Sequence, residues 1–399
     1  MTTRYFKRDM EKVLKSASRQ FPSVIVAGPR QSGKTTLLKH VFSRGYRYAS
    51  MDDPELRLMA VKEPSLFFEN YPPPVIIDEI QYAPQLFPYI KMMIDKNRSS
   101  SGRFILTGSQ LFPLMANVGE SLAGRIAVFT LLSFSIKEQF GSAAKLSIHK
   151  LKERALKGGF PELAVGKRVN PELWFASYLQ TYLERDVRNL RQMGDLSDFQ
   201  RFLQLITAFN GQVLNISSIS RDLGVAVNTV KAWVSILEAS GQIMLVKPFY
   251  INKGKRIVKS PKLYFLDTGI LCYLAGINSA TQVFKGYMAG QMLETIVLGE
   301  IVRNSYNQGK IPRIFWWRTS GGEEVDFILE HEDKIIPIEV KMSSAVNKNT
   351  TKNLTSFCDL FSEKVEKAFL VNFSREKVIA GKGLVVMPFN DFMHYVYTM

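Results

Sequence analysis

A glycine-rich loop near the N-terminus carries the clearest chemistry in this chain. Its spacing, GxxxxGK[ST], is that of loops that bind phosphate. Backbone N–H groups of such a loop converge on phosphate oxygens, and the start of the following helix adds a positive dipole. Lys34 would then contact the β- and γ-phosphates, and the Thr35 hydroxyl would bind Mg²⁺. The residues expected to hold the nucleotide are Gly28, Pro29, Arg30, Gln31, Ser32, Gly33, Lys34, Thr35 and Thr36.

An acid pair, Asp78 and Glu79, follows a continuous apolar run at 75–77. Such a run is typical of a central parallel strand that is covered on both faces. Ligands of parallel sheets lie at the carboxyl ends of the strands, so we expect Asp78 to bind Mg²⁺ directly or through water. Glu79 would orient and deprotonate the attacking water. Without a phosphate loop in the same chain, a surface turn would be the better explanation of this pair.

Two further polar side chains, Ser109 and Arg125, stand beside predicted strands. Ser109 follows the apolar run at 103–106 and is expected, in preference to Thr107, to sense the γ-phosphate. Arg125 directly precedes the last predicted core strand and would point away from its own nucleotide toward that of a neighbouring subunit. A guanidinium supplied in trans would stabilise charge on the transferring phosphoryl group. Capping of the preceding helix is the other explanation of Arg125.

A second set of charged residues occurs in the C-terminal third. Glu294 lies on the apolar face of a predicted helix over 290–303, and an acid there needs a partner or a site. Asp326 lies in the middle of a predicted strand, and Glu339 and Lys341 share one face of the next strand. Such carboxylates can bind one or two Mg²⁺ ions, whose bound water attacks a phosphodiester, and Lys341 would either orient a water or stabilise the developing oxyanion. We therefore predict a metal site of Glu294, Asp326 and Glu339, with Glu339 and Lys341 as catalytic groups.

The phosphate loop and the first acid pair require an α/β frame. Apolar runs alternate with helical patterns, which predicts a parallel sheet within an N-terminal domain at 1–195. The expected strands are near 23–27, 46–51, 75–77, 103–106 and 126–131, and the expected helices near 8–19, 34–43, 54–61, 86–97 and 111–123. The phosphate loop thus lies between a strand and a helix, as its motif requires. Residues 151–191 are mostly helical in pattern and would form a lid over the nucleotide.

The pattern changes in a central domain predicted at 196–260. A helix at 198–209, a short helix at 216–223, a third helix to Ala239 with Asn228 as its N-cap, and a strand at 242–246 follow one another. This order is that of a winged helix-turn-helix. The remaining residues, 261–399, form the third predicted domain. Its strand with Glu339 also contains Pro337, which is compatible with an edge strand.

The charge of the chain favours a polyanionic partner. It has 399 residues, a formal net charge of +16 and a sequence pI near 9.6. Residues 247–262 contain several lysines and an arginine but no acid, so we expect phosphate contacts with DNA from this basic wing rather than base reading by a helix. A winged helix that serves only as a structural or protein-contact module is the alternative.

The composition also limits location and chemistry. The four histidines and two cysteines are scattered, which argues against zinc. We see no apolar segment typical of a signal peptide or long enough to span a bilayer. A reduced cytoplasmic protein without membrane contact is the plain expectation.

Taken together, these motifs resemble a family of prokaryotic P-loop ATPases of the AAA+ class. The resemblance rests on the phosphate loop, on the segments 75–81, 106–110, 122–125, 158–162 and 261–269, and on 321–327 and 337–343. It implies an ATPase domain, a winged helix and a C-terminal α/β domain like PD-(D/E)xK nucleases, with ATP and Mg²⁺ as ligands. By this resemblance Ser109 matches a sensor position and Arg125 a finger position, which implies a homo-oligomer.

Two functions remain as hypotheses at this point. The first is an ATP-hydrolysing protein that acts on DNA, with a nuclease-like C-terminal domain. The second is a switch ATPase whose winged helix and C-terminal domain are protein-binding platforms without nuclease activity. A small-molecule kinase fits less well, because a water-positioning Glu79 directly after Asp78 favours hydrolysis.

Overall fold

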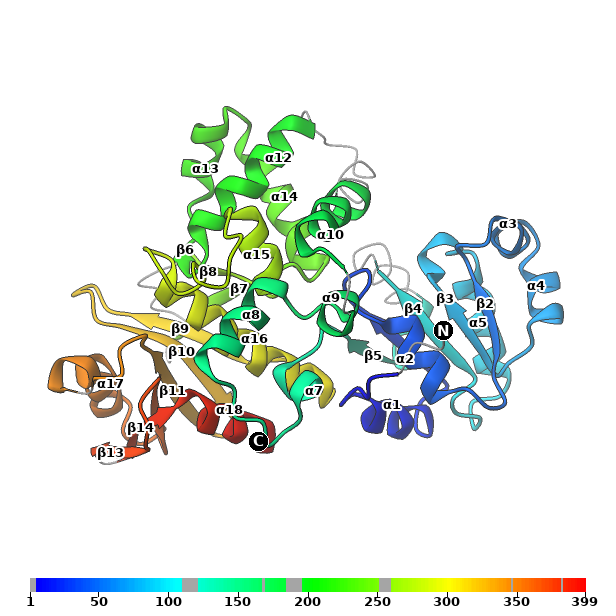
Figure 1. Cartoon of the computed structure of the whole chain (residues 1–399). Helices are drawn as coiled ribbons and strands as arrows, with labels where there is room; N and C mark the ends of the chain where they lie inside the picture. The colour runs from blue at the N-terminus through cyan, green and yellow to red at the C-terminus, as the bar shows by residue number, and fades with distance from the viewer. Residues whose placement is uncertain are drawn as a thin grey trace.

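Two β-sheets lie apart in the molecule and are joined by helices (Figure 1). The structure is a computed structural model that describes residues 5–109, 121–166, 169–183, 196–250, 260–345, 347–381 and 383–399. The predicted helix at 111–123 falls mostly outside these residues. No helix in the described ranges is both long enough and apolar enough to cross a bilayer.

The N-terminal sheet is parallel, as predicted from the alternation of apolar runs and helical patterns. Its strands have the order β2-β3-β4-β1-β5. They are β1 (Ser23–Ala27), β2 (Arg47–Ser50), β3 (Val75–Asp78), β4 (Phe104–Gly108) and β5 (Ile126–Thr130). Because successive side chains of a strand point to opposite faces, Val24 and Val26 enter one core and Ile25 and Ala27 the other.

Helices cover both faces of this sheet. The apolar sides of α1 (Glu11–Ser18) and α2 (Lys34–Val41) pack on one face. The other face is covered by α4 (Pro64–Asn70), which the sequence pattern did not predict, and by α5 (Leu86–Lys96). The α3 helix (Pro54–Lys62) packs against β2 and α4, and a short 3-10 turn, η1 (Ile80–Tyr82), follows β3.

The predicted lid is helical where the structure describes it. It contains α8 (Ile148–Lys157), α9 (Pro161–Val165), α10 (Pro171–Tyr178) and the π-helical turn η2 (Leu179–Leu183), and α7 (Ile136–Phe140) precedes it. Leu151 and Phe175 of these helices share one core with Val230 and Leu271, far along the chain. The hydrophobic core therefore continues across the domain boundary expected at 195.

Three helices and three short strands follow. They are α12 (Leu196–Leu205), extended by the 3-10 turn η3 (Ile206–Phe209), then β6 (Gln212–Val213), α13 (Ile216–Leu223), α14 (Val227–Ala239), β7 (Ile243–Pro248) and β8 (Lys262–Phe265). The prediction of Asn228 as an N-cap is wrong, because α14 begins at Val227, two residues earlier than predicted, and Ala226 takes the cap position. This start allows Trp233 to pack against Phe199 and Phe202, with ring centroids 5.5 and 5.2 Å apart.

The second sheet is nine-stranded and crosses the boundary predicted at 260. Its order is β13-β14-β12-β11-β10-β9-β7-β8-β6, so β7 and β8 join the C-terminal strands in one sheet. The C-terminal elements are α15 (Thr268–Leu274), α16 (Ala289–Asn307), β9 (Ile314–Arg318), β10 (Glu324–His331), β11 (Lys334–Val340), α17 (Lys348–Leu360), β12 (Ala368–Asn372), β13 (Val378–Gly381), β14 (Leu384–Pro388) and α18 (Phe389–Thr398).

Pro337 is compatible with an edge strand, but the structure places it in an interior one. Its strand, β11, lies between β10 and β12. The ladder with β12 begins only at Ile338, and the preceding bridge to that side joins Ile335 to Val365. Pro337 therefore stands where no backbone N–H is required, which is how an interior strand tolerates it.

Candidate functional site

The phosphate loop connects β1 to α2 at the carboxyl end of the sheet, and two glycines determine its course. Gly28 has a φ of +141°, and a Cβ there would lie 2.2 Å from the carbonyl oxygen of Leu131. Gly33 precedes α2 with a φ of +93°. Since other residues rarely adopt such angles, both glycines are required for the backbone to turn around a bound anion.

Polar groups of the loop are arranged to receive an anion. The Lys34 ammonium is buried and donates to the carbonyl oxygens of Gly28, at 3.1 Å, and Pro29, at 2.9 Å. The Ser32 hydroxyl is buried without a hydrogen-bond partner in the described structure. A buried hydroxyl without a partner is costly, so it marks a place where phosphate oxygens fit. Arg30 donates to the Tyr82 hydroxyl at 2.6 Å, and Gln31 has a φ of +58°.

Asp78 accepts hydrogen bonds from hydroxyl groups of three elements. It accepts from Thr35 Oγ1 at 3.0 and 2.9 Å, from the Tyr48 hydroxyl at 2.8 Å, and from Thr107 Oγ1. The structure thus brings Thr35 and Asp78 together, as the two predicted Mg²⁺ ligands must be. Tyr48 and Thr107 were not predicted here; both end up close because β2, β3 and β4 are neighbours in the sheet.

Glu79 lies beside Asp78 and is oriented by two side chains. Its Oε2 accepts from Ser109 Oγ at 2.8 Å and from Gln81 Nε2, and the φ of Glu79 is +52°. Burial alone would raise the pKa of Glu79, but the charge of Lys34 and these hydrogen bonds outweigh it and lower the pKa. Glu79 is therefore ionised at neutral pH, which a group that accepts a proton from water requires.

Arg125 lies at the other end of the first sheet. It precedes β5 and forms a two-pronged ion pair with Asp95 of α5, at 2.9 and 3.1 Å. The phosphate loop follows the carboxyl end of β1, which runs parallel to β5, so Arg125 is remote from the loop of its own chain. Its assignment as a finger for a neighbouring subunit stays a prediction.

The predicted acids of the C-terminal third also lie close together. Asp326 is held at a β-bulge of β10, where Oδ2 accepts from the Val340 backbone N–H at 2.8 Å. Glu339 is 3% exposed and pairs through Oε1 with Lys341 Nζ at 2.7 Å. Glu294, from α16, accepts from the Tyr264 hydroxyl at 2.8 Å. We call Glu294, Asp326, Glu339 and Lys341 the acidic cluster.

Strand β8 brings two further residues to the acidic cluster, Lys262 and Tyr264. The prediction that Lys262 contacts DNA as part of the basic wing is wrong, because Lys262 is 3% exposed and pairs with Glu324 of β10. Its burial has a cause in topology: β7 and β8 complete the sheet that carries β10. The basic residues at 251–259 lie outside the described residues.

Two acids of the acidic cluster have raised pKa values. Burial, reinforced by Asp326, raises the pKa of Glu294 to about 8 and that of Glu339 to about 7. The Oε2 atom of Glu339 is buried and has no hydrogen-bond partner in the described structure. Within the described ranges, however, no three or more His, Cys, Asp and Glu side chains are arranged as ligands of a metal ion. The metal site of Glu294, Asp326 and Glu339 therefore stays a prediction.

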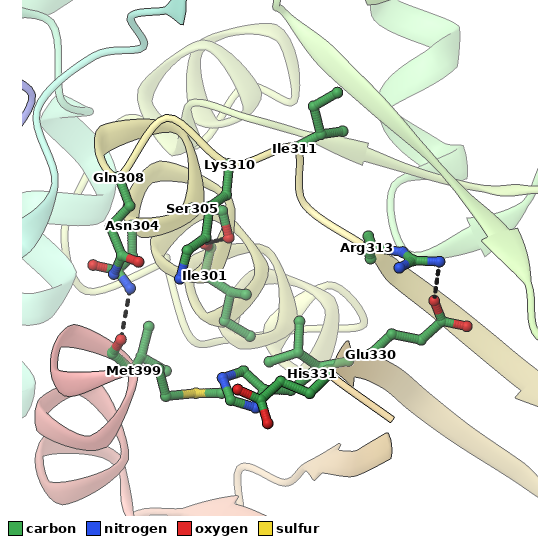
Figure 2. Close-up of a pocket in the computed structure, with 13 residues that line it drawn as sticks. Ile301, Asn304, Ser305, Gln308, Lys310, Ile311, Arg313, Glu330, His331 and Met399 are labelled. Carbon is green, nitrogen blue, oxygen red and sulfur yellow. Dashed lines mark hydrogen bonds and ion pairs between the residues drawn. The ribbon is translucent and has the colours of Figure 1, made fainter. Parts of the chain in front are cut away.

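A cavity of about 430 Å³ lies away from both groups of residues (Figure 2). It is found between the C-terminal end of α16, β10 and α18, and Ile301, Asn304 and His331 are among its lining residues. Its charged pair, Arg313 and Glu330, is joined at 3.0 Å. Because this pair is already neutralised, we assign the cavity no chemistry.

Three family models match successive parts of the chain. Residues 20–140 match an AAA domain, residues 148–281 a domain of unknown function (DUF8612), and residues 289–392 another domain of unknown function (DUF4143). The phosphate loop and the acid pair lie within the first match, so the residues predicted to bind the nucleotide belong to the part of the chain that is similar to an AAA domain. The acidic cluster lies within the third match, whereas Lys262 and Tyr264, which β8 brings to it, fall in the second.

Similar proteins come from bacteria and archaea. An uncharacterized protein of Mycobacterium tuberculosis is 27% identical over 339 residues, which cover 85% of this chain and 74% of that protein. One from Haemophilus influenzae is 23% identical over 371 residues and 87% of its length is covered. Among solved structures, a Walker-type ATPase of Pyrococcus abyssi is 15% identical with a TM-score of 0.47, over 68% of this chain and 96% of that one. A variant of Thermotoga maritima RuvB has 16% identity and a TM-score of 0.29, over 59% and 87%.

Proposed function

We propose that this protein is a Mg²⁺-dependent ATPase that acts on DNA. The observation that carries the ATPase half is the convergence of Lys34, Thr35, Asp78 and Glu79 at the carboxyl end of one sheet. The AAA domain match over residues 20–140 supports it independently.

The chain's own groups divide the hydrolytic work. Lys34 and the backbone of the phosphate loop bind and neutralise the phosphates. Thr35 and Asp78 supply the oxygen ligands that Mg²⁺ prefers, and this ion, when bound, neutralises charge on the phosphates. Glu79 orients the attacking water and accepts its proton, while Ser109 and Gln81 fix the carboxylate for that task.

The DNA half rests on charge and on the order of elements in the middle of the chain. The net charge of +16 favours a polyanion, and α12, α13 and α14 followed by β7 fit a winged helix-turn-helix. Lys247 of β7 is exposed and adjoins the basic residues at 251–259. We propose that this segment contacts the phosphates of DNA.

The acidic cluster is the proposed site of phosphodiester cleavage, in a fold like that of PD-(D/E)xK nucleases. The observation in favour is the unpartnered Oε2 of Glu339 beside Asp326, which is also buried, and Glu294, whose pKa is raised to about 8. Buried carboxylates in such excess are costly unless a cation joins them. Glu294, Asp326 and Glu339 would hold Mg²⁺, which would supply an activated water, and Lys341 would stabilise charge on the leaving or attacking oxygen.

Asp326→Asn is the variant that tests the cleavage proposal. We expect the purified protein to bind short DNA duplexes at moderate salt and to cut them with Mg²⁺ or Mn²⁺. Asp326→Asn should keep duplex binding, because it removes no basic group, but should lose cleavage by roughly 100-fold or more, since a metal ligand is removed. Gel analysis of the DNA and a fluorescence binding titration measure the two effects. Absence of DNA binding by the unchanged protein would remove the nucleic-acid half.

A second function is favoured by one observation. Lys262 and Lys341 already pair with acids in and beside the acidic cluster, at Glu324 and Glu339. Such pairs can stabilise a fold without any metal, as in a switch ATPase whose C-terminal domain is a protein-binding platform. In that case Glu294→Ala, Asp326→Ala and Lys341→Ala would leave the cellular function intact, while Lys34→Ala would abolish it.

The proposed role of Arg125 in a homo-oligomer has a separate test. Arg125→Ala and Lys34→Ala should each lose ATP turnover, and mixing the two variants should restore part of it, because a mixed assembly contains sites with both groups intact. Steady-state ATPase assays measure the recovery. Arg98→Ala is the matched control. Arg98 also pairs with Asp95, but its side chain is exposed and it lies just beyond the C-terminal end of α5. No recovery on mixing, with wild-type turnover in Arg125→Ala, would reduce Arg125 to a structural partner of Asp95.

A further inference from the structure

A buried arginine that the motif search did not select, Arg8, contacts the phosphate loop directly. Its guanidinium donates to the Ser32 carbonyl oxygen at 2.8 Å and to the Leu132 carbonyl oxygen at 2.8 Å. The Nε of the same guanidinium donates to Glu138 Oε1 at 2.9 Å. Arg8 is 3% exposed, and within the loop it bonds to a backbone carbonyl oxygen rather than to the N–H groups and side chains predicted to bind phosphate.

Glu138 passes this connection to helix α16. Its Oε1 also accepts from Asn307 Nδ2 at 3.3 Å, and Asn307 is the last residue of α16. The carboxylate is buried, and burial would raise its pKa, but the charge of Arg8 together with hydrogen bonds from Ser135, Arg8 and Asp9 outweighs this and lowers the pKa. Phosphate loop, Arg8, Glu138 and Asn307 thus form one continuous series of hydrogen bonds.

Helix α16 is firmly attached to the segment that follows β5. Arg303 donates to the Ser133 carbonyl oxygen at 3.1 Å, and Glu300 accepts from the Ile136 backbone N–H at 2.9 Å. The helix contacts β5 of the first sheet and also β8 and β11 of the second. Figure 1 shows it between the two sheets. These contacts along its length connect α16 to both sheets.

The opposite half of the same helix enters the acidic cluster. Glu294 lies about 20 Å from Asn307 along the axis, at a rise of 1.5 Å per residue. Glu294 accepts from Tyr264, and the neighbouring Thr295 accepts from Asn210 Nδ2 at 2.8 Å. A small shift of α16 along its axis would therefore change the position of Glu294 relative to the acids of β10 and β11.

We propose that Arg8 is a positioning residue of the phosphate loop and that, through Glu138 and Asn307, it transmits nucleotide binding along α16 to Glu294 in the acidic cluster. This inference rests on the proposed binding of ATP. The transmitting element is one rigid helix with one end at each site, so displacement of Ser32 by a bound phosphate is passed on as movement of Glu294.

Two variants interrupt the connection at its two ends. Arg8→Lys keeps the charge but cannot donate in three directions, so ATP binding should weaken by about tenfold. Asn307→Ala removes only the contact with Glu138 and should leave ATP affinity unchanged. Arg19→Lys, on the exposed end of α1, is the control for the first variant. Asn304→Ala is the control for the second, because it removes a hydrogen bond of the same helix to Val396 instead (Figure 2).

The readout is amide hydrogen exchange with and without ATP, in protein carrying Glu79→Gln so that ATP persists. We expect ATP to change exchange in the first half of α16 and in β10. This change should be lost in Arg8→Lys and reduced in Asn307→Ala, and should persist in both controls. A merely structural role of Arg8 would alter exchange equally with and without ATP.

The possible outcomes separate this inference from the proposed function. If calorimetry detects no ATP binding by the parent protein, the ATPase proposal is overturned and the inference with it. If ATP binds but exchange in α16 does not change, only the inference is overturned. It is also overturned if both Arg8→Lys and Asn307→Ala retain the full response of α16.

Discussion

Lys34→Ala is expected to abolish saturable ATP binding at concentrations where the unchanged protein is fully occupied. The Lys34 ammonium is the buried cation of the phosphate loop, and in the described structure it donates to two loop carbonyls that phosphate oxygens would replace as its partners. Charge-assisted hydrogen bonds of this kind contribute about 3 kcal/mol, so removal should weaken binding roughly 100-fold or more. Isothermal titration calorimetry with ATP and Mg²⁺ measures this loss.

Lys39→Ala is the matched control for this variant. Lys39 lies on the same helix, α2, but its ammonium is placed over the Tyr48 ring, 3.6 Å from the centroid, and not in the loop. It should bind ATP within about threefold of the unchanged protein, since a lone exposed cation–π contact contributes only about 0.5–1 kcal/mol. Equal affinities of the Lys34→Ala variant and the unchanged protein would contradict the assignment of the phosphate loop.

The N-terminal sheet could be predicted almost residue by residue. The bounds expected for β1 agree with the structure, as do the approximate positions of α2 and α5. The reason is physical: a parallel strand covered on both faces is a continuous apolar run, and its polar residues occur at the carboxyl end where the ligand binds. Both signals are local in the chain, so one sequence contains them.

Contacts between distant segments could not be predicted in this way. The residues that precede Lys262 in the sequence are basic, as in a wing that contacts DNA. Lys262 is nevertheless buried against Glu324, which is 62 positions away in the chain. Arg8 and Glu138 are 130 positions apart. Nothing in the neighbourhood of either residue indicates its partner, because pairing across a sheet or between domains depends on topology and not on local periodicity.

The domain boundaries at 195 and 260 stay a prediction, and contacts between distant segments cross both of them. The change in pattern after residue 195 is real, since α12 to α14 follow it, but the core of these helices includes Leu151 and Phe175 from the preceding segment. Likewise β7 and β8 belong to the sheet that carries Asp326 and Glu339. A motif order identifies the elements of a domain, whereas only packing determines which elements share a core. This sharing is what allows α16 to contact both sheets.

Glu79→Gln is expected to separate ATP binding from hydrolysis. The substitution keeps the shape of the side chain and its hydrogen bonds with Ser109 and Gln81 after a flip of the amide, but it removes the group that accepts a proton from water. General bases contribute about 100-fold to 10,000-fold, so ATP turnover should fall by this factor. ATP affinity should stay within about threefold, because Lys34, Thr35 and Asp78 are intact.

Single-turnover hydrolysis and ATP titration on the same preparation measure the two quantities. Gln81→Ala is a useful companion, because it removes one of the donors that orient Glu79 while the carboxylate itself remains. It should reduce turnover by less than Glu79→Gln does, since Ser109 still donates to Oε2 at 2.8 Å. Wild-type turnover in Glu79→Gln would exclude Glu79 as the base. Another group would then have to accept the proton. Asp78 is the other carboxylate at the carboxyl end of β3.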